Sequence, residues 1–233
     1  MQYKNSIQAT FIERPNRFIA YCEVEGERVK VHVKNTGRCK ELLVPGCTVY
    51  LEHDPNPNRK TAYSLITVQK GERLINMDSQ VPNKVFYEAI QEKSVTLPGL
   101  LGDVTLLKPE KTYKNSRFDA YIETKQEKAF VEVKGVTLED EGIVRFPDAP
   151  SERAVKHIYE LIEAMEEGYR AYLIFIIQMK GVKYFTPNRV THEAFAKAVE
   201  HAAAKGVHIL AYDCKVTEES IKIGEDVKVI LQP

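Results

Sequence analysis

Residues Arg117–Gly135 read RFDAYIETKQEKAFVEVKG, and this stretch decides the fold of the second half of the chain. Two alternating runs on either side of the polar residues 124–127 predict a β-hairpin. In an antiparallel hairpin with that loop, paired positions sum to a constant, and Asp119 falls opposite Glu132. Two acids are therefore expected side by side on neighbouring strands.

Alternation divides the hairpin into two faces. The acids Asp119 and Glu132 share one face with Lys134, two residues further on. The other face is apolar, and we expect a helix to cover it. Its members are Phe118, Ala120, Ile122, Ala129, Val131 and Val133.

Like charges directly opposite each other destabilise a sheet, so the acid pair needs a cation or a raised pKa. Mg²⁺ prefers oxygen ligands and keeps several waters, which suits a site with two carboxylates. Lys134 could then position a water or offset charge on a phosphoryl oxygen. The chemistry suggested is metal-assisted phosphodiester hydrolysis. The alternative is a solvated sheet face in which Asp119 pairs diagonally with Lys134, and Arg117 with Glu132, without a metal.

Outward from the hairpin, helical and strand patterns alternate. Residues 82–93, 151–168 and 191–206 predict helices, and residues 103–108, 171–178 and 207–213 predict strands. The continuous apolar run at 171–178 indicates a strand buried on both faces. The order predicts an α/β sandwich with a mixed central sheet in residues 82–233.

Residues 1–81 contain strand patterns instead. About five short strands with one short helix near 35–46, after the third strand, predict a small OB-like β-barrel. The fold class expected is thus α+β with two domains, 1–81 and 82–233. Cations of the first domain would bind the backbone of a nucleic acid, namely Lys30, His32, Lys34, Arg38, Lys40, Arg59 and Lys60. Tyr21, Tyr50 and Tyr63 are candidates for stacking on bases or for the core.

Composition excludes several classes of protein. The 233 residues carry no net charge, so nucleic-acid binding requires a local patch. No apolar run approaches the length of a membrane span, and the N-terminal residues lack the apolar region of a signal peptide. The four cysteines have no CxxC spacing, which predicts free thiols and a cytoplasmic location.

The acid–acid–lysine set within this order of elements resembles the PD-(D/E)XK nuclease fold. Longer segments resemble the sugar fermentation stimulation protein family, in that family's order and over residues 31–214. They are VHVKNTGRCKELLVPG, NRKTAY, VPNKVFYEAI, EKTYKNSRFD, EVKGVTL, FPDAPSERAVKHIYEL and KGVHILAYDC. The resemblance implies an OB-like domain, a nuclease-like domain and DNA binding.

Residue by residue, the resemblance implies Asp119 and Glu132 as ligands of Mg²⁺ or Mn²⁺ and Lys134 as the catalytic lysine. Glu88 would match the additional acid that many such nucleases carry on the preceding helix. Asp119 lies in SRFD instead of a literal Pro-Asp, a departure that keeps the charge. Glu110 is a further candidate, or the end of a strand.

The helix expected from Ser151 begins with Arg153 and Lys156, which could hold a phosphate at the helix N-terminus. The alternative is an exposed first turn with a Glu152–Lys156 pair. His157 could act as an acid or base, or be structural.

Three functions follow. The first is a DNA-binding protein with a Mg²⁺- or Mn²⁺-dependent nuclease site. The second is a non-catalytic DNA-binding regulator connected with sugar metabolism. The third, carbohydrate binding, is disfavoured because the chain has no Trp for a stacking platform. A homo-oligomer is compatible with the sequence, and no membrane partner is expected.

Overall fold

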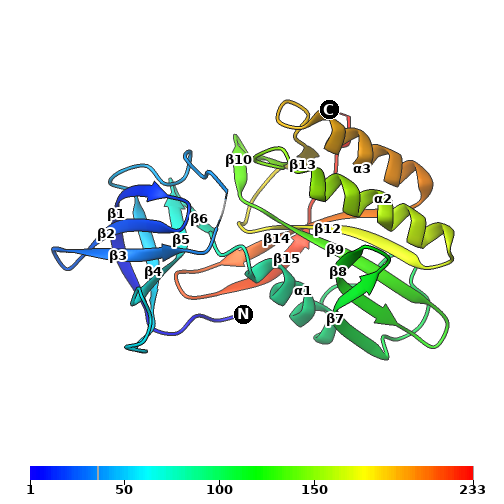
Figure 1. Cartoon of the computed structure of the whole chain (residues 1–233), viewed down its shortest axis with the longest axis horizontal. Coiled ribbons are helices and arrows are strands. Elements are labelled where there is room, and N and C mark those ends of the chain that lie inside the picture. The colour runs from blue at the N-terminus through cyan, green and yellow to red at the C-terminus, as the bar shows by residue number, and fades with distance from the viewer. Residues whose placement is uncertain (36, 233) are drawn as a thin grey trace.

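The chain folds into two parts that lie side by side in Figure 1. The computed structural model describes residues 1–35 and 37–232. Among the described residues, the first part contains strands and no helix, and the second alternates helices with strands. No helix among the described residues is long and apolar enough to cross a membrane.

The first part is a closed barrel of five strands with a sixth strand appended. Parallel pairing of β3 with β5 closes the sheet order β3-β2-β1-β4-β5-β6. Alternating residues fill the interior, and Val31, Leu51 and Leu65 have no exposed surface. The OB-like barrel is confirmed. Its strands are β1 (Ser6–Asn16), β2 (Ile19–Val24), β3 (Glu27–Val33), β4 (Thr48–His53), β5 (Tyr63–Lys70) and β6 (Arg73–Asn76).

Two details of the first part differ from expectation. The predicted helix near 35–46 is a single turn, in which the amides of Leu42 and Leu43 donate to the carbonyl of Cys39. Pro45 and Gly46 follow too closely for a helix to continue. The short strand β6 was not predicted, because four residues carry little periodicity.

The second part has a mixed six-stranded sheet, ordered β15-β14-β12-β9-β8-β7. Strands β9, β12 and β14 run parallel and the others antiparallel. Strands β10, β11 and β13 form a small second sheet; these three and β15 were not predicted. The elements are α1 (Val81–Gln91), β7 (Leu106–Tyr113), β8 (Ser116–Glu123), β9 (Lys128–Val136), β10 (Leu138–Asp140), β11 (Ile143–Phe146), α2 (Glu152–Glu166), β12 (Arg170–Ile177), β13 (Tyr184–Pro187), α3 (Glu193–Lys205), β14 (His208–Val216) and β15 (Ile221–Asp226).

Helices cover both faces of the central sheet. Helix α1 lies on one face, and α2 and α3 lie on the other (Figure 1). Phe86 of α1 packs in the cluster that contains Ala120 and Val131, whereas Leu161 of α2 belongs to the cluster with Phe130. Strand β12, between these layers, is buried from Ala171 to Ile177, as its apolar run predicts.

Candidate metal-binding and nucleic-acid-binding site

The hairpin has the predicted register, and its sheet opens at Asp119. Pairing runs from Glu123 with Lys128 to Ala120 with Val131, where it stops. On the other side, β7 pairs with β8 on both sides of Asp119 but not at it, opposite Glu110. Glu110 has a φ of 53°, which turns its peptide out of the regular strand. Asp119 therefore lies where neither neighbouring strand pairs with β8.

The carboxylate of Asp119 accepts hydrogen bonds where the backbone pairing of β8 with its neighbours is interrupted. Its Oδ2 accepts a hydrogen bond from the Val133 amide at 2.8 Å, and its Oδ1 accepts one from Nδ2 of Asn83 at 2.9 Å. Asn83 and Tyr87 are four residues apart on α1, and the Tyr87 hydroxyl donates to the Asp119 carbonyl. Three groups from two elements, α1 and β9, thus fix the orientation of this acid.

Glu132 is held from the opposite face of the sheet. Its side chain is buried, with the residue only 2% exposed, and Oε1 accepts hydrogen bonds from Lys134 Nζ at 2.5 Å and His157 Nδ1 at 2.6 Å. Arg153 Nε donates to the other ring nitrogen of His157, Nε2, at 3.5 Å. His157 on α2 therefore orients the carboxylate of Glu132.

The two acids differ in their protonation tendencies. Burial raises the pKa of Asp119, and the charge of Glu132 raises it further. Burial also pushes the pKa of Glu132 upward, but hydrogen bonds from His157 and Lys134 more than offset this and leave it below its usual value. Glu132 is thus the more readily ionised of the two acids, and Asp119 bears the cost of the shared negative charge.

The solvated sheet face of the alternative is wrong, because α2 covers the face that carries Glu132, although Lys134 does pair with an acid, namely Glu132. Arg117 does not pair with Glu132 and instead forms an ion pair with Glu110 at 3.3 Å. Phe118 was expected on the face of Ala120, but it packs beneath α2, next to Phe130. The interrupted pairing at Asp119 breaks the strict alternation and moves Phe118 to the other face.

The acids present fit a hard divalent cation. Glu132 Oε2 is buried and has no hydrogen-bond partner among the described residues, a costly arrangement for a carboxylate oxygen unless a ligand completes it. Within residues 1–35 and 37–232, no three His, Cys, Asp or Glu side chains converge into a ligand set. Two carboxylates with several waters or substrate oxygens match the way proteins bind Mg²⁺.

Glu88 does not join this pair. Its Oε2 forms an ion pair with the N-terminal ammonium of Met1 at 2.5 Å, and its side chain is 43% exposed. On α1, Asn83 and Tyr87 face Asp119, and Glu88 lies about 100° further around the helix. Sequence reasoning overlooked Asn83, although its i, i+4 spacing to Tyr87 marks one polar stripe on α1.

The first turns of α2 place cations beside His157. Ser151 caps the helix as predicted, because its side chain accepts from the Ala154 amide. Arg153 and Lys156 are exposed and line a pocket with Arg117 and His157. The expected Glu152–Lys156 pair is absent among the described contacts. Instead, Lys156 lies 3.7 Å from Glu160 and Glu152 contacts His192.

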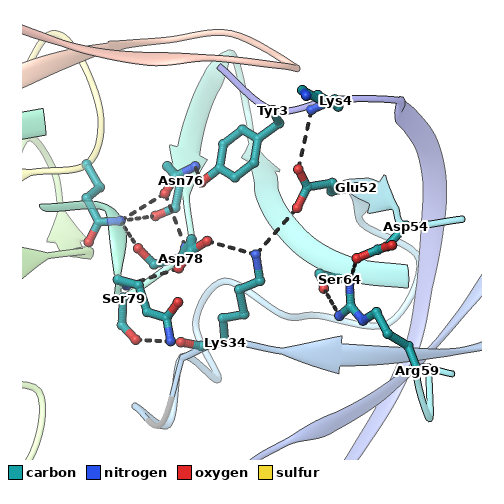
Figure 2. A network of polar contacts seen from close by, with 12 residues as sticks. Tyr3, Lys4, Lys34, Glu52, Asp54, Arg59, Ser64, Asn76, Asp78 and Ser79 are labelled. Carbon is teal, nitrogen blue, oxygen red and sulfur yellow. Dashed lines mark hydrogen bonds and ion pairs between the residues drawn. The ribbon is translucent and has the colours of Figure 1, made fainter. Parts of the chain in front are cut away.

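Two of the barrel cations predicted to bind nucleic acid are engaged within the protein. Figure 2 shows Lys34 between two acids, with Nζ 3.2 Å from Asp78 and 3.4 Å from Glu52. Arg59 forms an ion pair with Asp54 at 2.6 Å and donates to Ser64 (Figure 2). Lys34 thus connects the barrel to the residues that lead into α1.

The remaining predicted cations of the barrel differ in accessibility. Partial burial, helped by the charges of Arg59 and Lys34, lowers the pKa of His32, so the ring adds no charge near neutral pH. The other four, Lys30, Arg38, Lys40 and Lys60, are exposed.

The predicted stacking residues are largely engaged as well. Tyr50 is buried, while Tyr21 lies under Arg28 and Tyr63 packs on His53. The structure thus does not leave the basic stripe and its tyrosines together as one free surface.

Comparison with known proteins shows similarity over nearly the whole chain. Residues 12–77 match the model of an SfsA N-terminal OB domain, and residues 80–220 match that of a sugar fermentation stimulation protein RE domain. Sugar fermentation stimulation protein homologs from Clostridium beijerinckii and Ruminiclostridium cellulolyticum are 58% and 54% identical over 231 residues, which is 99% of this chain and 100% of each relative. A solved structure, Pyrococcus furiosus SfsA in complex with Ca²⁺, is similar with a TM-score of 0.86 at 28% identity, and the match covers 99% of this chain and 98% of that one.

Proposed function

The chain belongs to the sugar fermentation stimulation protein family, and from this premise we propose that it binds DNA and hydrolyses phosphodiester bonds with Mg²⁺ or Mn²⁺. The observation that carries the proposal is the pair Asp119 and Glu132, whose second buried oxygen, Oε2 of Glu132, has no partner among the described residues. The similar Pyrococcus furiosus structure was determined in complex with Ca²⁺, a cation that takes oxygen ligands as Mg²⁺ does.

Asp119 and Glu132 are the residues that would hold the cation. A divalent cation held there would supply Lewis-acid chemistry to a phosphodiester. Asn83 and the Val133 amide keep the Asp119 carboxylate in place, and His157 does the same for Glu132. Loss of such supporting contacts typically lowers metal affinity or activity about 10- to 100-fold.

Lys134 is the residue suited to act on the substrate. Its ammonium lies 2.5 Å from Glu132 Oε1, and the side chain keeps 16% of its surface exposed. A cation fixed at the edge of a buried acid pair can stabilise negative charge that develops on a phosphoryl oxygen. Arg153 and Lys156, exposed on the first turns of α2, would neutralise the flanking phosphates.

Cleavage assays on single- and double-stranded DNA with Mg²⁺ or Mn²⁺ test this proposal. We expect Asp119→Ala, Glu132→Ala and Lys134→Ala to lose cleavage. Glu88→Ala is the matched control, because it removes an acid from α1 that does not contact Asp119 or Glu132, and it should keep activity. Undiminished cleavage by Asp119→Ala or Glu132→Ala would refute the site.

A second candidate is a DNA-binding regulator without turnover, connected with sugar metabolism. It is favoured by one observation: Lys134 and His157 both occupy Glu132 Oε1, so half of this carboxylate is neutralised within the protein. This function predicts DNA binding that is weakened by salt and unaffected by Glu132→Ala, with no cleavage under any metal condition.

A further inference from the structure

The turn between β1 and β2 exposes an aromatic side chain. Asn16 pairs with Ile19 to close the turn, and its Oδ1 accepts hydrogen bonds from the amides of Phe18 at 2.9 Å and Ile19 at 3.1 Å. Phe18, at the tip, is 56% exposed, whereas the other phenylalanines of the described chain are buried or half-buried. Turn tips normally carry small polar residues, whereas this rigid turn presents the ring of Phe18, which is therefore available to a partner.

A partly exposed hydrogen-bond network fixes this turn to a neighbouring loop. The Arg14 guanidinium donates four hydrogen bonds to backbone carbonyls, at 2.9 Å to Gly37 and Arg38, 2.7 Å to Arg17 and 2.6 Å to Asn35. Arg17 neighbours Phe18 in the turn, while Arg38 lies in the loop. One arginine therefore holds both segments in a single arrangement, which is what a preformed binding surface requires.

This surface is positively charged. Arg17, Arg38 and Lys40 line one pocket, and within residues 1–35 and 37–232 none of the three has a carboxylate at ion-pair distance. Glu13 lines the same pocket, but Arg28 holds its carboxylate at 2.5 Å. Proteins that bind single-stranded nucleic acids combine cations for the phosphates with exposed aromatic rings for the bases, and this surface has both.

The surface also reaches towards the candidate catalytic site. The Arg38 amide donates to Oδ2 of Asp148 at 3.3 Å, and Asp148 lies three residues before the cap of α2. The first turns of α2 carry Arg153 and His157, and His157 contacts Glu132. A strand bound at Phe18 could thus extend across this junction towards the acid pair.

We propose that Phe18, with Arg17, Arg38 and Lys40, forms a base-stacking site for single-stranded nucleic acid. The face of a base is available for stacking in a single strand and hidden inside a duplex, so an exposed ring favours the former. The inference deepens the proposed function by naming the class of substrate. It concerns the barrel alone and does not need a metal.

The test measures binding of a fluorescein-labelled 16-nucleotide strand by anisotropy, in EDTA, for full-length wild-type protein and variants. We expect Phe18→Ala to weaken binding of single-stranded DNA by about 5- to 140-fold, the range given by ~1–3 kcal/mol of stacking per base at ~1.4 kcal/mol per factor of ten. Phe18→Tyr keeps a ring and should bind within about twofold of wild type. Tyr159→Ala, which removes a 48% exposed aromatic residue on α2, is the matched control.

Charge is tested by the triple variant Arg17→Ala, Arg38→Ala and Lys40→Ala. Its slope of log affinity against log salt should fall by about 2, because each lost phosphate contact contributes ~0.7 for a single strand. A single-stranded RNA and a duplex of the same sequence complete the set: RNA should follow DNA, whereas the duplex should bind equally to wild type and Phe18→Ala.

Several outcomes would overturn the inference. The first is that wild-type protein does not bind the single strand, and the second is that Phe18→Ala binds it as tightly as wild type does. The third is that Phe18→Ala loses equal affinity for duplex and single strand, because Phe18 would then insert between the base pairs of a duplex. Failure of the acid pair is a separate result, because the measurement excludes metal. Phe18-dependent binding of the single strand without any cleavage would refute the proposed hydrolysis and leave this inference standing.

Discussion

Glu139 joins the barrel to the second part, and its substitution is the first prediction. Its carboxylate, on β10, accepts hydrogen bonds from Lys70 Nζ at 2.8 Å and the Gly142 amide at 2.6 Å, and it lies 2.7 Å from Arg73. Burial raises the pKa of Glu139, but the bonds from Lys70, Gly142 and Arg73 outweigh it and lower the pKa from 4.5 to about 2. We predict that Glu139→Gln destabilises the fold and loosens the barrel from the site.

The magnitude follows from that pKa. A lowering from 4.5 to about 2 corresponds to about 3 kcal/mol, at ~1.4 kcal/mol per pH unit. Lys70 and Arg73 keep 36% and 27% of their side-chain surface exposed, so screening by solvent reduces this to ~1–2 kcal/mol. For a chain of this size, the melting temperature should fall by about 2–8 °C at pH 7.

The pH dependence has a definite sign. Because the folded-state pKa of Glu139 is depressed, its stabilisation is complete above about pH 4.5 and is lost as the pH falls towards about 2. The assay is urea and thermal denaturation of wild type and Glu139→Gln at pH 7 and pH 3. The control is Glu163→Gln, which breaks a half-exposed pair with Lys114 and should cost under ~0.5 kcal/mol. Equal stability of the two variants at pH 7, or a gap that widens at pH 3, would refute the reasoning.

Three further variants test the site and its supports. Asp119→Asn should abolish metal binding yet raise the melting temperature of the metal-free protein. Burial and Glu132 raise the pKa of Asp119, so its negative charge destabilises the fold when no metal is bound. A lower melting temperature of the variant would contradict this. Asn83→Ala removes the donor to Asp119 Oδ1 and should weaken Mg²⁺ affinity about 10- to 100-fold in calorimetry, whereas unchanged affinity would show that Asn83 does not position the ligand. Lys34→Met should lower the free energy of unfolding by ~1–3 kcal/mol, because it leaves the buried Asp78 without its cation; DNA binding weakened at unchanged stability would restore Lys34 to the nucleic-acid surface.

The sequence predicted the regular elements of the fold and the pairing of the hairpin. The secondary structure of long segments such as α2 and β12 is predictable from the segment itself, because the pattern of its apolar residues distinguishes a helix with one buried face from a buried strand. The register of Glu123 with Lys128 follows from the loop alone. Short strands such as β6 and β10 escaped prediction, since three or four residues cannot display a period and their pairing depends on distant partners.

The site was predictable only in part. Asp119, Glu132 and Lys134 share a short stretch, which marked them as one site, but the interrupted pairing at Asp119 and its contacts with α1 do not follow from alternation. The contact between His157 and Glu132 joins residues 25 apart in sequence, and it depends on how α2 crosses the sheet. Lys34 and Arg59 were assigned to a binding surface because the sequence does not show which acids the fold brings next to them. Phe18 was missed because an apolar residue in a turn gives no periodic signal.

The proposed hydrolysis requires that the acid pair Asp119 and Glu132 bind a divalent cation. Calorimetric titration of Mg²⁺ and Mn²⁺ into wild type and Glu132→Ala, with and without a DNA oligonucleotide, tests this directly. The account predicts binding by wild type that disappears in Glu132→Ala while circular dichroism shows an unchanged fold. Absence of Glu132-dependent binding in both conditions would contradict it, and the unpartnered Oε2 of Glu132 would then have no ligand to explain it.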